Sequence, residues 1–234
     1  MLDRTTPSPA RSGLAPKRRS AQGGDNSERS RERLLQAALS LFAGQGYART
    51  STREIAELAG ANLAAISYYF GDKAGLYRAV LSELREHPHQ NPARFSAADM
   101  SLAEALRGYF AAYVEPLRQG HAARQCMKLQ LRELLEPTGL WQAEISDAQR
   151  GTHDALLGVL CRHLGLVRLD DELAGLGSSI AALGMHLHLG HDQYDSPAAS
   201  AAGNDVALDR WLDRLVRFSL AMVAAEQQRR CALA

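Results

Sequence analysis

The sequence has few aromatic residues, few cysteines and almost no net charge. Of its 234 residues, 6% are Phe, Trp or Tyr and 46% are hydrophobic, and the β-branched and aromatic runs typical of strands are missing. This composition, rich in Ala and Leu, predicts an all-α protein. The formal net charge of +1 excludes a global basic field, so any binding to nucleic acid must depend on a local surface.

The three cysteines, Cys126, Cys161 and Cys231, are far apart and form no CxxC pair. This pattern fits reduced thiols in the cytosol better than a disulfide framework. The first 30 residues lack the apolar core of a secretory signal, and no run approaches the roughly 20 apolar residues of a membrane span. We therefore expect a cytoplasmic protein that does not interact with a membrane.

Catalytic and cofactor-binding motifs are also missing. The sequence has no nucleophile elbow, no metalloprotease motif and no phosphate-binding glycine motif after a strand. Gly175-Leu176-Gly177 lies inside a helical pattern, where it does not favour nucleotide binding. We therefore expect that the protein is not an enzyme and binds no cofactor. The alternative, a helical enzyme, predicts that the protein turns over a substrate.

A histidine cluster near residue 190 resembles a set of metal ligands. It contains His186, His188 and His191 together with Asp192. On a helix, however, positions 186 and 188 diverge and only 188 and 191 share a face, whereas zinc usually needs four convergent ligands. We expect no metal site, although a metal sensor at these histidines or a thiol sensor at Cys126 stays an alternative.

Residues 49–77 carry the start and stop signals of two short helices. Ser51 is followed three residues later by Glu54, the spacing of a capping box, which predicts a helix of about two turns with Ile55, Leu58 and Ala59 on its buried face. Gly60 ends this helix because glycine tolerates a left-handed backbone, and Asn62 can cap the next one. The turn of three or four residues is the spacing of a helix-turn-helix unit.

The second short helix, residues 63–70, has an unusual outer face. If Ile66 and Phe70 point inward, the outer face holds small residues and hydroxyl groups and no acid. Such a helix can approach an anion closely. Tyrosines that only complete a core would give the same pattern.

Four spaced segments extend this pattern: Gly46-Tyr47-x-x-Thr50-Ser51, Ile55-Ala56-x-x-Ala59-Gly60, Ile66-x-Tyr68-Tyr69-Phe70 and Asp72-Lys73-x-x-Leu76-Tyr77. In this combination they resemble the DNA-binding domain of the TetR family of transcriptional regulators, over residues 29–84. Ala61 and Ala64 depart from the family pattern, in which Val and Gly are common.

The chain is expected to contain three parts. Residues 1–27 are rich in Pro, Ser, Gly and Arg, which predicts a disordered basic tail. Such a tail can lie along DNA phosphates or enter a minor groove, and a solvated tail without a specific role is the alternative. A three-helix helix-turn-helix DNA-binding domain over residues 28–90 follows. Asn91-Pro92 marks the boundary with a helical ligand-binding and dimerisation domain over residues 91–234, which brings the total to about nine helices.

The resemblance implies that residues 63–70 enter the major groove of double-stranded DNA. Phosphates would be contacted by Thr50, Ser51, Tyr69 and Lys73. Base edges or thymine methyl groups would be contacted by Thr52, Arg53, Leu63, Ala64, Ala65, Ser67 and Tyr68. Arg53 is the strongest candidate for a guanine contact, although a contact to phosphate alone fits equally well.

Residues 131–138 resemble the corresponding part of the CecR-like subgroup, which implies a ligand domain of that type. In this region Ser101 and Glu104 form a second capping box, Pro116 should disturb the helix that follows, and Thr138 should cap a long helix. The apolar faces suggest an effector pocket, or equally well a core, made by Tyr109, Tyr113, Met127, Leu131, Trp141 and His153.

Heptad-like apolar seams run along the last two helices. They predict a four-helix bundle between two copies, and the family resemblance points to the same interface, with ordinary core as the alternative. The interface residues would be Leu176, Ile180, Leu183, Leu187, Trp211, Leu215, Phe218 and Met222.

The function expected from these features is that of a ligand-responsive repressor. A homodimer would bind a palindromic operator through half-sites about 34 to 36 Å apart and would be released by a small-molecule effector. A transcriptional activator of the same fold, or a metal- or redox-responsive regulator, is the alternative.

Overall fold

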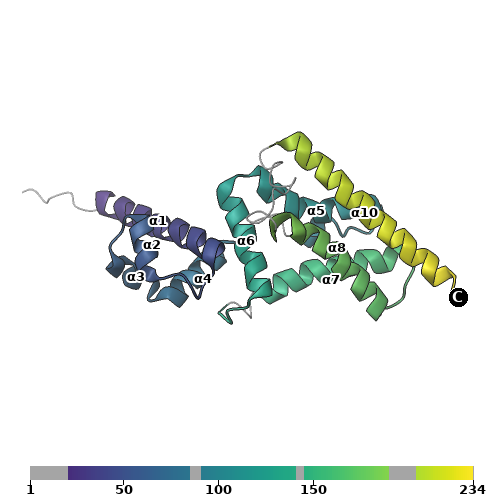
Figure 1. Ribbon diagram of the computed structural model, residues 1–234, viewed down its shortest axis with the longest axis horizontal. Helices are drawn as coiled ribbons and strands as arrows, with labels where there is room; N and C mark the ends of the chain where they lie inside the picture. Colours follow the sequence, from purple (N-terminus) through teal and green to yellow (C-terminus); the bar gives the residue numbers. More distant parts are fainter. Residues whose placement is uncertain (1–20, 85–90, 141–144, 190–203, 234) are drawn as a thin grey trace, which may run out of the picture.

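The computed structural model describes residues 21–84, 91–140, 145–189 and 204–233. These ranges contain nine α-helices and one short 3-10 helix, and no strand (Figure 1). The elements are α1 (Ala21–Gln45), α2 (Thr52–Ala59), α3 (Leu63–Phe70), α4 (Lys73–Leu84), η2 (Pro92–Arg94), α5 (Leu102–Arg118), α6 (His121–Leu135), α7 (Ile145–His163), α8 (Asp171–Leu189) and α10 (Asp205–Cys231). The predicted all-α fold is confirmed.

Helices α1–α4 pack around one hydrophobic cluster at one end of the molecule. Phe42 of α1, Ile55 of α2, Ile66 of α3 and Leu76 of α4 are all fully or almost fully buried in it. The cluster also takes in residues of α6, which lies between this end and the rest of the chain (Figure 1). The first four helices therefore complete their core with a helix from outside the predicted DNA-binding domain.

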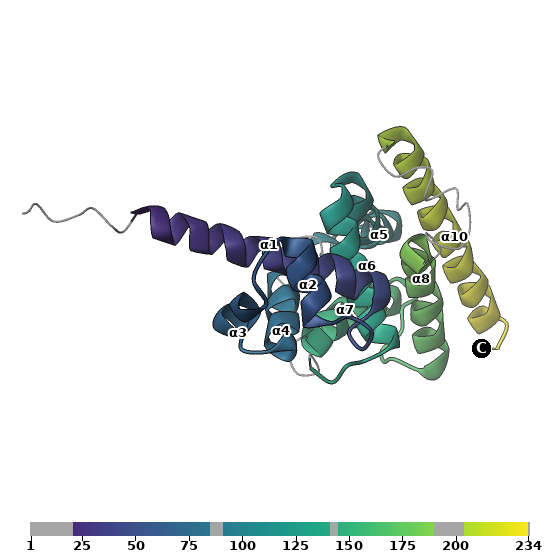
Figure 2. The ribbon, with the colours of Figure 1, turned by 60° about the vertical axis from the view of Figure 1, so that its left-hand side comes forward.

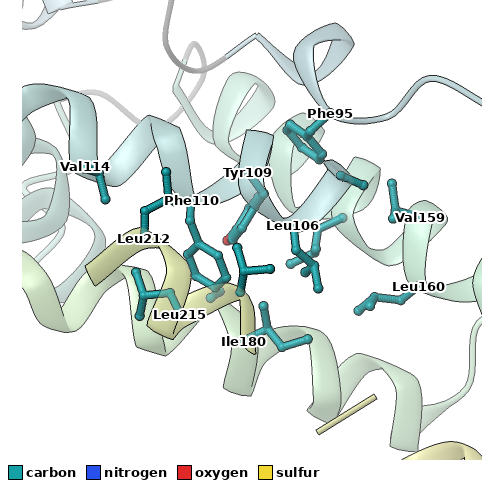
Figure 3. Packing of buried hydrophobic residues seen from close by; sticks show 14 of the residues in the cluster. Phe95, Leu106, Tyr109, Phe110, Val114, Val159, Leu160, Ile180, Leu212 and Leu215 are labelled. Atoms are coloured by element: carbon teal, nitrogen blue, oxygen red, sulfur yellow. The ribbon is translucent and has the colours of Figure 1, made fainter. Parts of the chain in front are cut away.

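A second cluster joins α5, α7, α8 and α10. Leu106 and Phe110 of α5 point toward Ile180 of α8 and Leu215 of α10 (Figure 3). Helices α8 and α10 lie side by side, away from α1–α4 (Figure 2). Burial of these apolar side chains is the main force that holds the four helices together.

Three local predictions differ from the structure. Helix α1 begins at Ala21, so residues 21–27 of the predicted tail are helical, while residues 1–20 lie outside the described residues. Helix α5 continues through Pro116 to Arg118, because a proline in the last turn removes only one hydrogen bond before the helix ends. Thr138 does not cap α7, which is described from Ile145; its hydroxyl accepts a hydrogen bond from the Leu140 amide.

A network of ion pairs fastens the end of α10 to the start of α8. The Arg230 guanidinium donates to the Asp170 carboxylate at 2.7 and 2.8 Å and to Glu226 Oε1 at 2.6 Å. Arg230, with help from the Leu173 amide, holds the pKa of Asp170 far below its usual range. Arg229 first, and then Arg230, lower the pKa of Glu226 to about 2.

We expect this network to make stability depend on acid pH. Because the folded pKa values are lowered, the stabilisation is complete above the unfolded values of about 4 and is lost as the pH falls toward about 2. Arg230→Met should lower the urea midpoint at pH 6, and its difference from wild type should shrink between pH 5 and pH 3. Arg210→Met, an exposed arginine on the same helix, is the control; an equal pH trend in both variants would contradict the prediction.

Candidate nucleic-acid interface

Local hydrogen bonds define the ends of α2 and α3. The Ser51 amide donates to Glu54 Oε2 at 2.8 Å and the Glu54 amide donates to Ser51 Oγ at 3.1 Å, which confirms the capping box. These bonds hold the pKa of Glu54 below its usual value. Gly60 has a left-handed backbone with φ 58°, and Asn62 Oδ1 accepts from the Ala64 amide at 2.9 Å. Helices α2 and α3 are thus joined by residues 60–62, the predicted helix-turn-helix spacing.

Helix α3 buries Ile66 and turns Tyr68 to solvent. The Tyr68 side chain is 80% exposed and Leu63 is 50% exposed, with Ala64 and Ser67 also exposed between them. No residue of the helix is acidic. The outer face is therefore uncharged, small at its centre and able to approach an anionic surface without like-charge repulsion.

Tyr69 is held by α1. Its hydroxyl is hydrogen bonded to Ser27 Oγ at 2.8 Å, and its ring contacts the Tyr68 ring edge-on with centroids 4.9 Å apart. Ser27 thus positions the tyrosine pair, a role that the sequence did not reveal because residues 1–27 lack helical periodicity. Of the two tyrosines, Tyr68 is the one that faces outward.

Thr50 does not belong to the outer surface. Its side chain is 2% exposed, and its hydroxyl donates to the Gly46 carbonyl at 2.8 Å, where it closes the turn after α1. The prediction that Thr50 contacts phosphate does not fit this position, because its hydroxyl faces the chain itself. Leu58, which was expected to be buried, is instead exposed on α2.

Two cations lie near the ends of the short helices. Arg53 Nε donates to Glu57 Oε1 at 3.0 Å, but both side chains are largely exposed, so the pair is weak and a new partner can replace it at small cost. Lys73 Nζ lies 4.2 Å from the centroid of the Tyr47 ring. Partial burial lowers the pKa of Lys73, and the nearby Glu54 opposes that shift.

Gly75 fixes how closely α4 approaches α3. A Cβ atom at this position would lie 1.9 Å from the Phe70 carbonyl oxygen, so no other residue fits without moving the backbone. The Asp72 carboxylate accepts from the Gly75 amide at 2.7 Å. Helix α4 is therefore packed directly on the end of α3, and the only signal in the sequence was a glycine within a helical pattern.

The predicted pocket residues that the structure describes lie on α5, α6 and α7. Tyr109 is buried and its hydroxyl is 3.1 Å from that of the half-buried Tyr113. Burial raises the pKa of both tyrosines, so both stay protonated. Met127 and Leu131 of α6 are buried and His153 of α7 is half-buried. Trp141 lies outside the described residues.

The described histidines do not form a metal site. His188 is buried, and its Nε2 lies 2.7 Å from the Tyr113 carbonyl oxygen, which occupies one ring nitrogen. Within the described ranges no group of three or more His, Cys, Asp or Glu side chains is arranged to hold a metal ion. His191 and Asp192 lie outside these ranges. Burial raises the pKa of the Cys126 thiol to about 11, so this cysteine is not a reactive thiolate.

The predicted dimer seam is partly core. Ile180, Leu187 and Leu215 are buried within one chain, so they cannot meet a second copy, and the prediction is corrected at these positions. The reason is that α5 packs against α8 and α10 and covers one side of both seams. Phe218 is 49% exposed; Leu176, Leu183, Trp211 and Met222 are half-buried.

Among the described helices none is long and apolar enough to cross a bilayer.

A helix-turn-helix unit at one end of an all-helical chain defines the class of this protein, a helix-turn-helix regulator. The family model described as bacterial regulatory proteins, tetR family, matches residues 34–80. The model for the C-terminal domain of the HTH-type transcriptional dual regulator CecR matches residues 102–222. The chain belongs to the TetR family, whose members are transcriptional regulators rather than enzymes, and its second half is of the CecR type.

Curated relatives agree with this assignment. YttP of Bacillus subtilis (strain 168), named a probable HTH-type transcriptional regulator, is 31% identical over 44% of this chain and 50% of its own length. The dual regulator CecR of Shigella flexneri is 52% identical over 22% of this chain and 23% of its own length. The repressor AcnR of Corynebacterium diphtheriae is 29% identical over 78% of this chain and 87% of its own length. The chain thus spans only half, or less, of YttP and CecR.

Solved structures show the same fold. A TetR-like transcriptional regulator from Rhodococcus sp. RHA1 superposes with a TM-score of 0.59 and 17% identity, over 83% of this chain and 96% of its own. The hemolysin II transcriptional regulator HlyIIR superposes with a TM-score of 0.54 and 21% identity, over 81% of this chain and 98% of its own. At this identity the likeness concerns the fold alone.

Proposed function

We propose that the protein is a homodimeric repressor that binds a palindromic operator through α3 and is released by a small-molecule effector. The observation that carries the proposal is the acid-free outer face of α3, whose largest side chain, Tyr68, is 80% exposed and contributes little to the core. Small, hydroxyl-bearing and aromatic side chains that share one exposed helix face can contact base edges and thymine methyl groups in a major groove. AcnR, which aligns over most of this chain, is named a repressor.

The proposed DNA surface is centred on α3. Ser51, Lys73 and the amides at the start of α2 and α4 would contact phosphates, because helix N-termini attract anions. Tyr69 is a further phosphate candidate. To contact a phosphate, its hydroxyl would have to share or give up the hydrogen bond that it makes with Ser27. The residues proposed to contact base edges or thymine methyl groups are those predicted from the sequence: Thr52, Arg53, Leu63, Ala64, Ala65, Ser67 and Tyr68. Since bacterial DNA lies in the cytoplasm, the proposal places the protein there.

The proposed dimer interface uses the outer faces of α8 and α10. Small exposed residues follow one another along α8 at helical intervals: Gly175, Ser178, Ser179 and Ala182. Phe218 and Ala221 are exposed on α10. Small residues let helices approach closely, so two such pairs can form a four-helix bundle. Leu176, Leu183, Trp211 and Met222 would border it.

Ala182→Trp should convert the dimer into monomers. The indole ring would hold the two α8 helices apart, while the exposed position leaves the fold of each chain intact. Sedimentation equilibrium should give 25.5 kDa for the variant and twice this mass for wild type. Ala103→Trp, the same change at an exposed position of α5, should stay dimeric; a dimeric Ala182→Trp variant would place the interface elsewhere.

The proposed effector site lies among α5 to α8, near the paired hydroxyls of Tyr109 and Tyr113. Met127, Leu131, Trp141 and His153 complete the proposed set. An effector that prefers a different position of the DNA-binding helices lowers DNA affinity by the same factor by which DNA lowers effector affinity. The repressor would then leave its operator.

The test is a sequence-selection experiment with the purified full chain at physiological salt. We expect an imperfect palindrome with half-sites one helical turn apart, bound far more tightly than unrelated duplex. Equal binding to all duplexes would remove the proposal. An operator that overlaps a promoter supports repression, an upstream operator supports activation, and a loss of binding on chelation or oxidation supports a metal or redox sensor.

A further inference from the structure

Helix α6 packs along α1 of the DNA-binding unit. Its Cys126 and Leu129 are buried in the cluster formed by α1–α4. Gln125 Nε2 donates to Ser40 Oγ of α1 at 2.9 Å. The end of α6 carries the CecR-like segment, residues 131–138, which the proposed DNA surface, dimer face and effector site leave largely unexplained.

Within that segment, Glu133 is a buried carboxylate that three donors hold in place. Its side chain accepts from the Tyr77 hydroxyl of α4 at 2.6 Å, from the Thr138 amide at 2.9 Å and from the Thr138 hydroxyl at 2.8 Å. Glu133 is 7% exposed and Tyr77 is fully buried. A buried carboxylate is tolerated only when such donors replace water, so the arrangement resists displacement of any partner.

Tyr77 is a permanent donor in this arrangement. Burial, followed by the hydrogen bond to Glu133, raises its pKa far above the usual value, so it keeps its proton. Its ring lies edge-on to those of Phe42 and Tyr47, both with centroids 4.9 Å away. The ring is thus part of the core of α1–α4, and the hydroxyl extends from that core to α6.

Arg132 attaches the same end of α6 to the end of α1. Its Nη2 donates to the Gly44 carbonyl at 3.4 Å, and its side chain lies against Gly46, where a Cβ atom would be 3.0 Å from Nη1. Gly46 has φ 83°, which also favours glycine. Two neighbouring residues of α6 therefore form hydrogen bonds with two different helices of the DNA-binding unit, Arg132 with α1 and Glu133 with α4.

We propose that Glu133, held by Tyr77 and Thr138, is a positioning residue that fixes α3 relative to the dimerising half of the chain. The path runs from α3 to α4 through the close contact at Gly75, and from Tyr77 of α4 to Glu133 of α6. This inference rests on the proposed function. We call the hydrogen-bonded contact between Tyr77 of α4 and Glu133 of α6 the joint. In a dimer, the joint sets the spacing of the two copies of α3.

Loss of the joint should therefore lower the affinity for a palindrome and leave the affinity for a single half-site unchanged. A palindrome is bound by both copies, and the second contact gains from a high effective concentration only if the spacing is maintained. A single half-site is bound by one copy and does not sense that spacing. The ratio of the two affinities isolates the joint from the DNA contacts themselves.

The test uses the full chain and two duplexes, the selected palindrome and the same sequence with one half-site scrambled. In Tyr77→Phe and Glu133→Ala we expect the ratio of palindrome to half-site affinity to fall by about tenfold, a partial loss of the roughly 10²- to 10⁴-fold gain that simultaneous binding of two sites can give. Affinity for the half-site should stay within about twofold. Tyr77→Phe keeps the ring, and hence the core contacts.

Glu115→Ala is the matched control, because Glu115 is a half-buried carboxylate of α5 that pairs with Arg118 of the same helix at 3.6 Å. It should keep the wild-type ratio. An unchanged ratio in Tyr77→Phe and Glu133→Ala, or an equal fall in Glu115→Ala, would overturn the inference. If wild type itself showed no preference for the palindrome over unrelated duplex, the proposed function would have failed instead.

Discussion

Replacing Tyr68 by alanine should weaken binding to the selected operator by at least about 30-fold and leave the melting temperature almost unchanged. Each contact to a base edge or a thymine methyl group is worth about 1–3 kcal/mol, and the proposed dimer loses it twice. The folded chain loses little, because the side chain is 80% exposed and its ring contact among the described residues is with the neighbouring Tyr69. Fluorescence anisotropy and thermal unfolding, measured on the same samples, separate the two effects.

Two further variants identify what Tyr68 contributes. Tyr68→Phe keeps the ring and removes the hydroxyl, so it should retain most of the affinity if the ring contacts a methyl group and lose it if the hydroxyl contacts a base edge. Val167→Ala, at a fully exposed position between α7 and α8, should change neither property. A Tyr68→Ala protein that binds the operator as wild type does would show that α3 does not read DNA through this face.

Leu106→Ala should lower the free energy of unfolding by about 2–5 kcal/mol. Leu106 has no exposed surface and lies on α5 at the centre of the cluster formed by α5, α7, α8 and α10 (Figure 3). Truncation removes buried methyl groups and leaves a cavity that the surrounding helices can fill only in part. A loss of this size is a large share of the 5–15 kcal/mol that stabilises a typical domain.

Urea unfolding followed by circular dichroism measures this loss, and Leu169→Ala is its matched control. Leu169 lies between α7 and α8 with about half its surface exposed, so the same truncation there should cost less than about 1 kcal/mol. Equal losses in the two variants would show that the helices of the second half do not pack as described.

Local signals in the sequence were read correctly where both partners lie within one helical turn. The capping boxes of Ser51 with Glu54 and of Ser101 with Glu104 are both present, and Gly60 adopts the left-handed backbone predicted for it. These features depend on hydrogen bonds between residues three positions apart. They form whatever the rest of the chain does, so a sequence pattern is enough to find them.

Predictions of which side chains are buried and which are exposed were less accurate. The apolar spacing of Ile180, Leu187 and Leu215 indicated an interface with a second copy, but the structure buries all three beneath helices of the same chain. Leu58 was expected inside and is exposed, whereas Thr50 was expected outside and is buried. Periodicity identifies an apolar stripe but cannot say which neighbour covers it, because that neighbour is distant in the sequence.

By itself, the sequence determined most of the helices, the caps of α2, α3 and α5, the helix-turn-helix spacing and the acid-free surface of residues 63–70, because each follows from side chains within a few positions of one another. The tertiary structure alone decided that Tyr77 and Glu133, 56 positions apart, share a buried hydrogen bond, and that Ser27 holds Tyr69. Such pairs arise only when packed helices bring remote polar groups together and exclude the water that would otherwise satisfy them.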